Sequence, residues 1–358
     1  MNTSTTTALP QPPHDLRVGL AGLGRFGKLH ASVLGTLPGV RLAALCDTRP
    51  DELRALGQLY GVPATRQYLD YGRMIAEAAL DAVFLVTPEP FHAAQALAAI
   101  ARGLPVFTEK PLAITAADGV RVAEAARAAG VYLQVGFVLR FEIQHALLKE
   151  RIAAGALGEL VSVRVKRNVS RAWFPDYGDL AHPIFETGIH DLDLLLWYAA
   201  SPVGSVYAVH RFLTGRRFPD ACFALVQFAS GAIGFLETAW CLPEGAPANV
   251  LTPTWSGSID AALEVVGTEG TARLSLLEGG LQLWTTERVE QPGAGLWPAL
   301  HGRTVGALRE EDLHFVERVR TGSPSSIASI DDAVAGLRLA EAIVQSAESD
   351  REIRLSEA

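Results

Sequence analysis

Glu186 and His190 are the first residues in this sequence whose types and spacing could do acid–base chemistry. They lie four residues apart within 184–199, a stretch with helical spacing of apolar residues, so both side chains face the same way. An imidazole titrates near neutral pH and can take a proton from a hydroxyl group, and a carboxylate one turn away can orient the ring. The pair predicts His190 as a general base that is assisted by Glu186.

His182 extends this spacing and raises the alternative of a metal site made with Glu186 and His190. Pro183 follows it, however, and proline favours the first position of a helix, which would leave His182 outside the regular spacing. We therefore expect no metal in the site.

A second group of residues has the pattern of a nucleotide site. Gly22-Leu23-Gly24-Arg25-Phe26-Gly27 reads G-x-G-x-x-G, follows an apolar run, opens a helical stretch and lies twenty residues before Asp47. In that context the glycines allow a tight turn, close approach of a pyrophosphate and close packing of helix on strand, while the helix N-terminus offers N–H donors. The pattern predicts a dinucleotide site that includes Gly22, Gly24, Arg25, Phe26 and Gly27.

The residues after the glycine motif bear on the choice of cofactor. Asp47 should accept hydrogen bonds from the adenosine ribose and repel a 2′-phosphate, which favours NAD. Arg49 could bind a 2′-phosphate, so NADP remains an alternative. Farther along, Thr87 and Pro88 follow an apolar run and should line the cofactor site, whereas His92 either contacts the cofactor or packs locally.

The residues of the two sites must be brought together by secondary structure. The pattern of the first third of the chain predicts strands whose ends meet at one edge of a sheet. Apolar runs alternate with helical stretches, which is typical of βαβ crossovers and a parallel sheet covered on both faces. The strands are expected at 16–21, 40–46, 82–86, 106–108 and 131–135, and the helices at about 25–37, 50–60, 91–102 and 116–129.

After about residue 137 the pattern changes to helices followed by short strands with glycine-containing turns, typical of an antiparallel sheet. The helices are expected at about 141–154, 184–199, 307–320 and 331–347, the strands at 160–167, 206–212, 222–228, 233–238, 262–266, 272–276 and 281–284, and a long loop at 290–303. The fold class is thus α/β: an N-terminal Rossmann doubly wound parallel sheet plus a C-terminal α+β domain with a largely antiparallel open sheet. We expect a tail at 1–15, a dinucleotide-binding domain at 16–136 and a substrate-binding and oligomerisation domain at 137–358.

Composition narrows the class of protein. The 358 residues carry a formal charge of −8, which argues against a nucleic-acid partner, and no apolar run long enough to span a bilayer is free of glycine, proline or charge. The three cysteines are widely spaced, as in a protein of the reducing cytoplasm. These observations predict a cytoplasmic protein without a membrane or nucleic-acid partner.

Glu109-Lys110-Pro111 ends the strand at 106–108. With the glycine motif, the Thr-Pro-x-x-x-His run, Gly188-Ile189-His190-Asp191 and residues 136–141, it resembles the Gfo/Idh/MocA family of oxidoreductases over nearly the whole chain. The resemblance implies that Glu109 and Lys110 contact the cofactor and that Lys110 also polarises the reacting hydroxyl, where an ammonium stabilises a developing alkoxide. Inositol dehydrogenases of the family carry aspartate where this chain has Glu186, which leaves the role of Glu186 open.

The resemblance also implies a substrate site. Arg140, Lys166 and Asn168 match positions that contact substrate in inositol-dehydrogenase-like members, and strand alternation puts Lys166 and Asn168 on one face and Arg167 on the other. Such a polar lining suits a polyol, sugar or cyclitol. Relatives commonly pair through the second sheet, so a homodimer or homotetramer is expected.

The leading hypothesis is an NAD(P)-dependent dehydrogenase that oxidises a sugar or cyclitol hydroxyl. Three alternatives are kept. One is an NAD-dependent glycosidase that oxidises its sugar transiently, for which Asp176 or Tyr177 would supply a further acid or base. Another is an NADPH-dependent keto-sugar reductase, because Arg49 could bind the 2′-phosphate of NADPH. The third is a binding protein without catalysis, which the presence of both Lys110 and His190 disfavours.

Overall fold

The computed structural model describes residues 15–173, 179, 181–252, 255–276, 281, 283–284, 289–290 and 295–355. Residues 1–14 of the expected tail lie outside these ranges. No helix within the described ranges is long and apolar enough to cross a membrane.

The first sheet is the predicted doubly wound parallel sheet. Its six strands run in the order β3-β2-β1-β4-β5-β6, and every pair is parallel. The strands are β1 (Leu16–Ala21), β2 (Val40–Cys46), β3 (Gln67–Tyr68), β4 (Ala82–Leu85), β5 (Val106–Glu109) and β6 (Leu133–Gly136). The helices are α1 (Arg25–Leu34), α2 (Pro50–Tyr60), α3 (Tyr71–Glu77), α4 (His92–Ile100) and α5 (Ala116–Ala129). The sequence patterns missed β3, which has only two residues, and α3.

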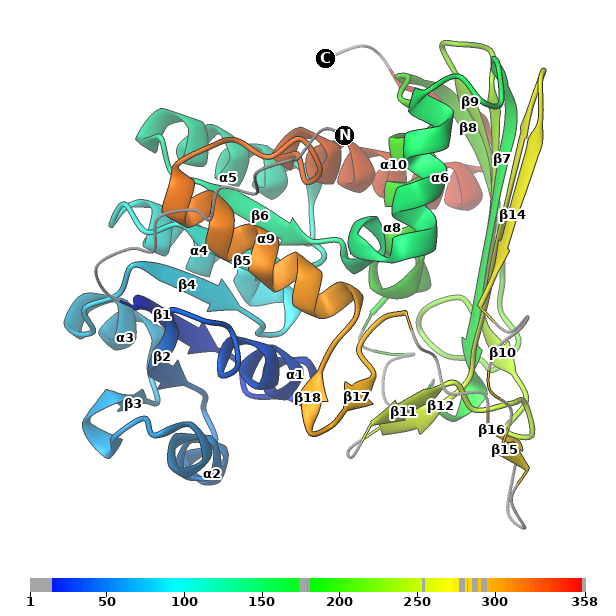
Figure 1. Ribbon diagram of the computed structural model, residues 1–358. Coiled ribbons are helices and arrows are strands. Elements are labelled where there is room, and N and C mark those ends of the chain that lie inside the picture. Colours follow the sequence, from blue (N-terminus) through cyan, green and yellow to red (C-terminus); the bar gives the residue numbers. More distant parts are fainter. Residues whose placement is uncertain are drawn as a thin grey trace, which may run out of the picture.

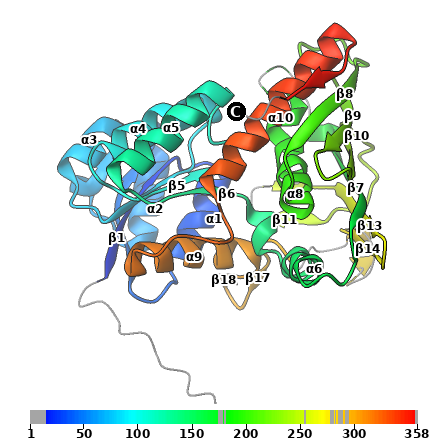
Figure 2. The same cartoon turned by 90° about the horizontal axis from the view of Figure 1, so that it is seen from above.

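A helix from the far end of the chain completes this unit. α9 (Ala307–Thr321) lies across the face of the first sheet that α1 also covers, with α4 and α5 on the opposite face (Figures 1 and 2). Phe315 of α9 packs edge-on against Phe84 of β4 and Phe107 of β5, with ring centroids 5.0 and 5.8 Å apart. The division at 136/137 thus marks where the chain first leaves the Rossmann sheet, and residues 307–321 return to its core.

The second sheet is largely antiparallel, as predicted. Its order is β14-β13-β7-β10-β9-β8-β19, and of its pairs only β7–β10 is parallel. The strands are β7 (Leu160–Ser170), β8 (Val203–Arg211), β9 (Ala221–Phe228), β10 (Ile233–Leu242), β13 (Ile259–Gly267), β14 (Thr271–Ser275) and β19 (Ile353–Arg354). Three hairpins add β11 (Val250–Thr252) with β12 (Trp255–Gly257), β15 (Leu283–Trp284) with β16 (Val289–Glu290), and β17 (Ala299–Leu300) with β18 (Arg303–Thr304). The β17–β18 hairpin corrects the expectation of an unbroken loop at 290–303.

Helices cover one face of the second sheet and leave the other open (Figure 2). The covering helices are α8 (Ile189–Ala199), which packs on β7, and α10 (Ile330–Ser349), which packs on β8; α6 (Ile143–Ala153) lies beside α8. Along β7, Val163 and Val165 are buried under the helices, while Arg164 points to the open face and is exposed. Short helical turns link these elements: η1 (Ala64–Arg66), η2 (Glu89–Phe91), η3 (Val138–Phe141), η4 (Arg171–Trp173) and η5 (Ile184–Gly188).

Candidate active site

The glycine motif forms a tight turn between β1 and α1. Gly22 has φ +89°, and a Cβ there would lie 2.2 Å from the Val86 carbonyl oxygen. A Cβ on Gly27 would lie 1.9 Å from the Gly22 carbonyl oxygen, so helix and strand touch at this point. Gly24, by contrast, faces open space, and α1 begins there without a side-chain cap. The open space at Gly24 and the start of α1 without a side-chain cap fit a pyrophosphate.

Asp47 stands beside this turn and accepts a hydrogen bond from the Leu23 amide at 2.7 Å. Arg49 donates to the same carboxylate through Nε at 3.0 Å and lies 3.5 Å from Glu52. Burial would raise the pKa of Asp47, but the hydrogen bonds from Arg49 and Leu23 outweigh it and lower the pKa. Because two carboxylates hold the Arg49 guanidinium, their charge opposes binding of a 2′-phosphate next to it.

The Thr87–His92 segment lies at the same sheet edge, after β4. The His92 ring is buried, with Nδ1 2.7 Å from the Pro111 carbonyl oxygen and Nε2 2.6 Å from that of Thr87. Thr87 donates its hydroxyl to Gln95 at 2.6 Å. His92 thus packs locally and ties the segment after β4 to the one after β5, and its ring nitrogens are not directed at the cofactor.

Lys110 follows β5 and meets Glu186 of η5. Its Nζ donates to the Glu186 carbonyl oxygen at 2.7 Å and lies 3.2 Å from the carboxylate. Burial would lower the pKa of Lys110, but the carboxylates of Glu186, Glu109 and Glu89 raise it. The ammonium is therefore held charged at the carboxyl end of the first sheet.

His190 lies on the first turn of α8 and is half-buried. Its Nδ1 is buried and has no hydrogen-bond partner among the described residues. Burial, and the positive charges of Lys110 and Arg167, lower its pKa well below the ordinary value. The imidazole is neutral at neutral pH, which is the form that accepts a proton.

Two further residues belong to this constellation and were not predicted. The Glu89 carboxyl hydrogen-bonds that of Glu186, and after burial, the largest cause, it contributes to the raised pKa of Glu186. Arg167 reaches α8 from β7 and donates to Asp191 at 2.8 and 3.0 Å. Glu89 could have been found from its place at the end of β4, since strand ends meet at one edge.

Lys166 and Asn168 lie on the face of β7 opposite Arg167, as the alternation predicted. That face is the open one, however, where Lys166 donates to Asp260 at 2.7 Å and Asn168 donates to Glu237 at 2.7 Å. Within one chain these residues therefore point away from Lys110 and His190. The alternation along β7 is confirmed, and the contact of these two residues with a substrate stays a prediction.

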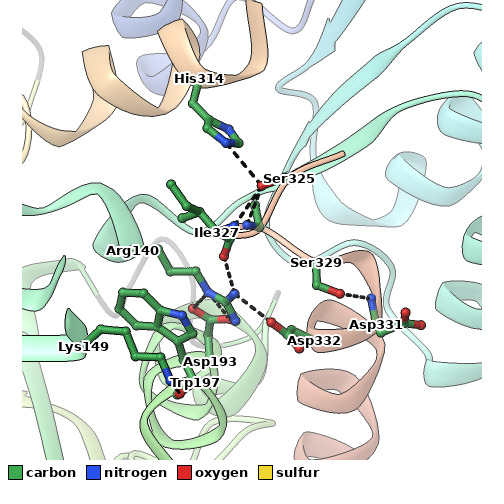
Figure 3. Close-up of polar contacts among 11 residues, drawn as sticks. Arg140, Lys149, Asp193, Trp197, His314, Ser325, Ile327, Ser329, Asp331 and Asp332 are labelled. Carbon is green, nitrogen blue, oxygen red and sulfur yellow. Dashed lines mark hydrogen bonds and ion pairs between the residues drawn. The ribbon is translucent and has the colours of Figure 1, made fainter. Parts of the chain in front are cut away.

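Arg140 is likewise engaged elsewhere (Figure 3). Its guanidinium is buried and donates to Asp193 at 2.6 Å, Asp332 at 2.7 Å and the Ile327 carbonyl oxygen at 2.6 Å. Those contacts join η3, α8 and the start of α10. These contacts give Arg140 a structural role in holding the second domain together, and its expected contact with a substrate stays a prediction.

Glu109 links the site to a buried histidine, and its expected contact with the cofactor stays a prediction. Its carboxylate lies 3.1 Å from Nε2 of His30, whose Nδ1 lies 2.8 Å from Asp312 of α9. Burial alone would lower the pKa of His30, but Asp312 and Glu109 raise it to about 10. Glu109 is part of a buried ion network behind β5.

The remaining residues predicted for the site lie in several different places. Arg25 is exposed on the first turn of α1, and the Phe26 ring packs edge-on against Trp297 at 5.3 Å. His182 precedes the turn that begins after Pro183 and lies beside His210, at a ring separation of 5.0 Å. Asp176 and Tyr177, the acid or base expected for a glycosidase, lie outside the described residues.

Comparisons with known proteins agree with this geometry. Residues 16–137 match the model of an oxidoreductase family with an NAD-binding Rossmann fold, and residues 145–273 match the GFO/IDH/MocA C-terminal domain. Inositol 2-dehydrogenase 4 of Saccharopolyspora erythraea is 31% identical over 327 residues, which cover 90% of each chain. Myo-inositol 2-dehydrogenase of Thermotoga maritima is 28% identical and covers 96% of this chain and 99% of its own.

Solved structures share the fold. GenD2 from gentamicin A biosynthesis, in complex with NAD, superposes with a TM-score of 0.80 at 25% identity, over 96% of this chain and 97% of its own. Scyllo-inositol dehydrogenase from Lactobacillus casei with bound NAD(H) and scyllo-inositol has a TM-score of 0.79 at 21% identity, over 95% and 99% of the two chains. The chain therefore belongs to the GFO/IDH/MocA family of NAD-binding oxidoreductases.

Proposed function

We propose that this protein is an NAD-dependent dehydrogenase that oxidises a hydroxyl group of a cyclitol of the inositol type. The observation that carries the proposal is the meeting of Lys110, Glu186 and His190 at the edge of the sheet that also bears the glycine turn. The names of the two relatives in Saccharopolyspora and Thermotoga support an inositol as substrate.

The residues divide the reaction between them. The Lys110 ammonium donates a hydrogen bond to the reacting oxygen and stabilises the negative charge that develops there. His190, kept neutral by burial and by the nearby cations, accepts the hydroxyl proton. Glu186 orients Lys110 through its carbonyl and carboxylate oxygens. NAD, when bound, accepts the hydride.

The proposal names NAD over NADP because of the residues around Arg49. The Arg49 guanidinium is held by Asp47 and Glu52. The Asp47 carboxylate is placed next to the glycine turn, where it can accept hydrogen bonds from ribose hydroxyls. We expect NAD to be bound more tightly than NADP.

The test measures absorbance at 340 nm with purified protein, NAD or NADP, and a panel of inositol isomers, aldoses and glycosides. We expect NADH formation with at least one inositol isomer and loss of that signal in Lys110→Ala. Lys166→Ala, whose lysine lies on the open sheet face, is the matched control and should keep it. Release of aglycone from a glycoside without NADH formation would overturn the proposal in favour of the hydrolase.

We also propose that two or four copies associate through the open face of the second sheet. This face carries partly exposed aromatic side chains, Tyr207, Phe223 and Phe235, around a hollow of about 760 Å³. Exposed apolar patches of this kind mark interfaces. Light scattering should report a dimer or tetramer, and Phe235→Glu should yield monomers.

A cytoplasmic location is also proposed, supported by the free thiols of Cys46, Cys222 and Cys241.

A further inference from the structure

Three metal-ligating side chains gather at one end of the second sheet. His210 of β8 and Cys222 of β9 are directly opposite each other in the strand ladder, and His182, just before η5, lies over them. One ligand atom from each of the three residues lies within 4.8 Å of the other two. None of the three is in the Lys110–Glu186–His190 constellation.

Two imidazole nitrogens of this cluster are left without a hydrogen bond in the described part of the chain. Nε2 of His182 and Nε2 of His210 are both buried, and neither has a hydrogen-bond partner among the described residues. A buried polar atom without a partner is rare in native proteins and points to a missing ion, water or ligand. A neutral imidazole carries one nitrogen lone pair that can bind a cation.

We propose that His182, His210 and Cys222 bind one transition-metal cation of the zinc class. Two imidazoles and one thiolate are the donor set of known tetrahedral zinc sites that keep a fourth position for another ligand. His182 and His210 also line a cavity of about 720 Å³, from which water could supply that fourth ligand. Phe185, Phe212 and Phe218 pack around the two histidines and shield the site.

Binding requires two protons to move. The Cys222 thiol, whose pKa burial raises to about 12, releases its proton to solvent as the metal–sulfur bond forms. The Ile184 amide donates to Nδ1 of His182 at 3.2 Å, so without metal the proton of that ring is on Nε2. Coordination through Nε2 transfers the ring proton to Nδ1 and gives up this long contact, a loss far smaller than the gain from a thiolate–imidazole site.

The geometry also says which ligand moves. Bond lengths of about 2.0–2.3 Å in a tetrahedral site put ligand atoms about 3.3–3.8 Å apart. The present separations reach up to 4.8 Å, so the cluster must contract to hold a metal. His210 and Cys222 are fixed by the β8–β9 ladder, whereas His182 precedes Pro183 in the connection to η5. The metal would therefore draw His182 toward the sheet and fasten the start of η5, the turn that carries Glu186.

The test uses the full chain without a histidine tag, stripped with chelator and titrated with Co²⁺ and then Zn²⁺. We expect one Co²⁺ per chain, the intense visible absorption of tetrahedral cobalt, a near-ultraviolet thiolate-to-cobalt band, and displacement by Zn²⁺. Failure of the wild-type chain to bind Co²⁺ or Zn²⁺ stoichiometrically overturns the proposal without need of any variant.

Variants then identify the ligands. Cys222→Ser should abolish the thiolate band and weaken Co²⁺ binding at least tenfold, and His210→Gln should weaken binding to a similar degree. Cys241→Ser removes the half-buried cysteine of β10 and is the matched control that should bind as the wild type does. A thiolate band that persists in Cys222→Ser but disappears in Cys241→Ser would assign the metal to a different cysteine and contradict the site. Because the readout is metal binding, it is independent of the proposed dehydrogenase activity.

Discussion

Two neighbouring residues at the end of β5 lead into two different regions of the molecule. Glu109 points inward to His30 and Asp312, which are fully buried, and Lys110 points outward to Glu186 and the half-buried His190. Both regions combine carboxylates with a histidine. We call them the inner network (His30, Glu109, Asp312) and the outer site (Lys110, Glu186, His190).

The difference lies in what the histidine of each region contacts. Both ring nitrogens of His30 have a carboxylate partner, so the ring is held charged and its pKa is raised to about 10. His190 keeps Nδ1 without a partner in the described part of the chain, and its pKa is lowered. The same side chain is thus a structural cation in one region and a proton acceptor in the other, because the neighbouring charges have opposite signs.

The inner network also explains how helix α9 is held on the first sheet. Asp312 belongs to α9, His30 to α1 and Glu109 to β5, so three segments distant in sequence meet at one imidazolium. Neighbouring Glu311 is fully buried, and burial, with the charges of Glu109 and Asp312, raises its pKa well above the ordinary value. Its surroundings therefore favour the neutral form of Glu311, which limits the negative charge near the network.

The largest effect should come from the outer site. His190→Asn removes the proposed base while keeping a side chain of similar polarity, and we expect kcat/KM for the oxidised substrate to fall about 10²–10⁴-fold. Thermal stability and NAD affinity should stay near the wild-type values, because Nδ1 of His190 holds no other part of the described chain. Steady-state kinetics, NAD titration and thermal unfolding measure the three quantities. A loss of activity smaller than tenfold would contradict the assignment of His190 as base.

Asp312→Ala should have the opposite effect, with a loss of stability and little change in kcat/KM. It leaves the buried His30 with one carboxylate fewer, and breaking such a pair lowers the free energy of unfolding by about 3–5 kcal/mol. Urea unfolding measures this, with Asp51→Ala, on the exposed surface of α2, as the control that should change by less than about 0.5 kcal/mol. If Asp312→Ala were as stable as Asp51→Ala but inactive, the assignment of Asp312 to the inner network would be contradicted.

pH should separate the two regions as well. Because the pKa of His30 is raised from 6.5 to about 10, its contribution to stability is fully present below pH 6.5 and is lost as pH rises toward 10. The slope reaches at most about 1.4 kcal/mol per pH unit. The outer site predicts that neither His190, whose pKa is lowered, nor Lys110, whose pKa is raised, changes kcat/KM between pH 6.5 and 9, so any dependence there comes from Glu186, whose pKa is also raised.

The measurement is the free energy of unfolding at pH 7, 8 and 9 in the wild type and in His30→Gln, together with kcat/KM over the same range. Groups elsewhere in the chain contribute equally to both proteins, so the difference isolates His30. Equal slopes in the two proteins would show that His30 is not charged in the native state.

The smallest effect is expected on the open face of the second sheet, which belongs to neither region. Lys166→Ala removes a partly exposed ion pair with Asp260, so stability should change by no more than about 1 kcal/mol and kcat/KM by less than about twofold. A rise of KM above tenfold would mean that this face takes part in a substrate site after all. Substrate titration at fixed NAD measures it.

Local patterns predicted most of the elements. The bounds of β1 (Leu16–Ala21), β2 (Val40–Cys46), α2 (Pro50–Tyr60) and α5 (Ala116–Ala129) were predicted to the residue, because continuous apolar runs and helical spacing leave little choice there. The role of Lys110 beside the reacting hydroxyl was expected from the family resemblance, whereas its contact with Glu186 was not predicted. Glu89 was missed, although its place after β4 put it at the same sheet edge as Lys110.

The sequence by itself determined the order of strands and helices, the glycine turn and the pairing of residues along β7, because these depend on spacing along the chain. Only the tertiary structure decided which face of β7 the helices cover, and hence that Lys166 and Asn168 point away from the site. It also decided the partners of Arg140 and Glu109, which come from segments more than fifty residues away in the chain, Asp193, Asp332 and His30. The physical reason is that the sequence does not show whether a charged side chain will pair with a substrate or with a residue on a distant helix. Tertiary packing decides which of the two lies next to that side chain.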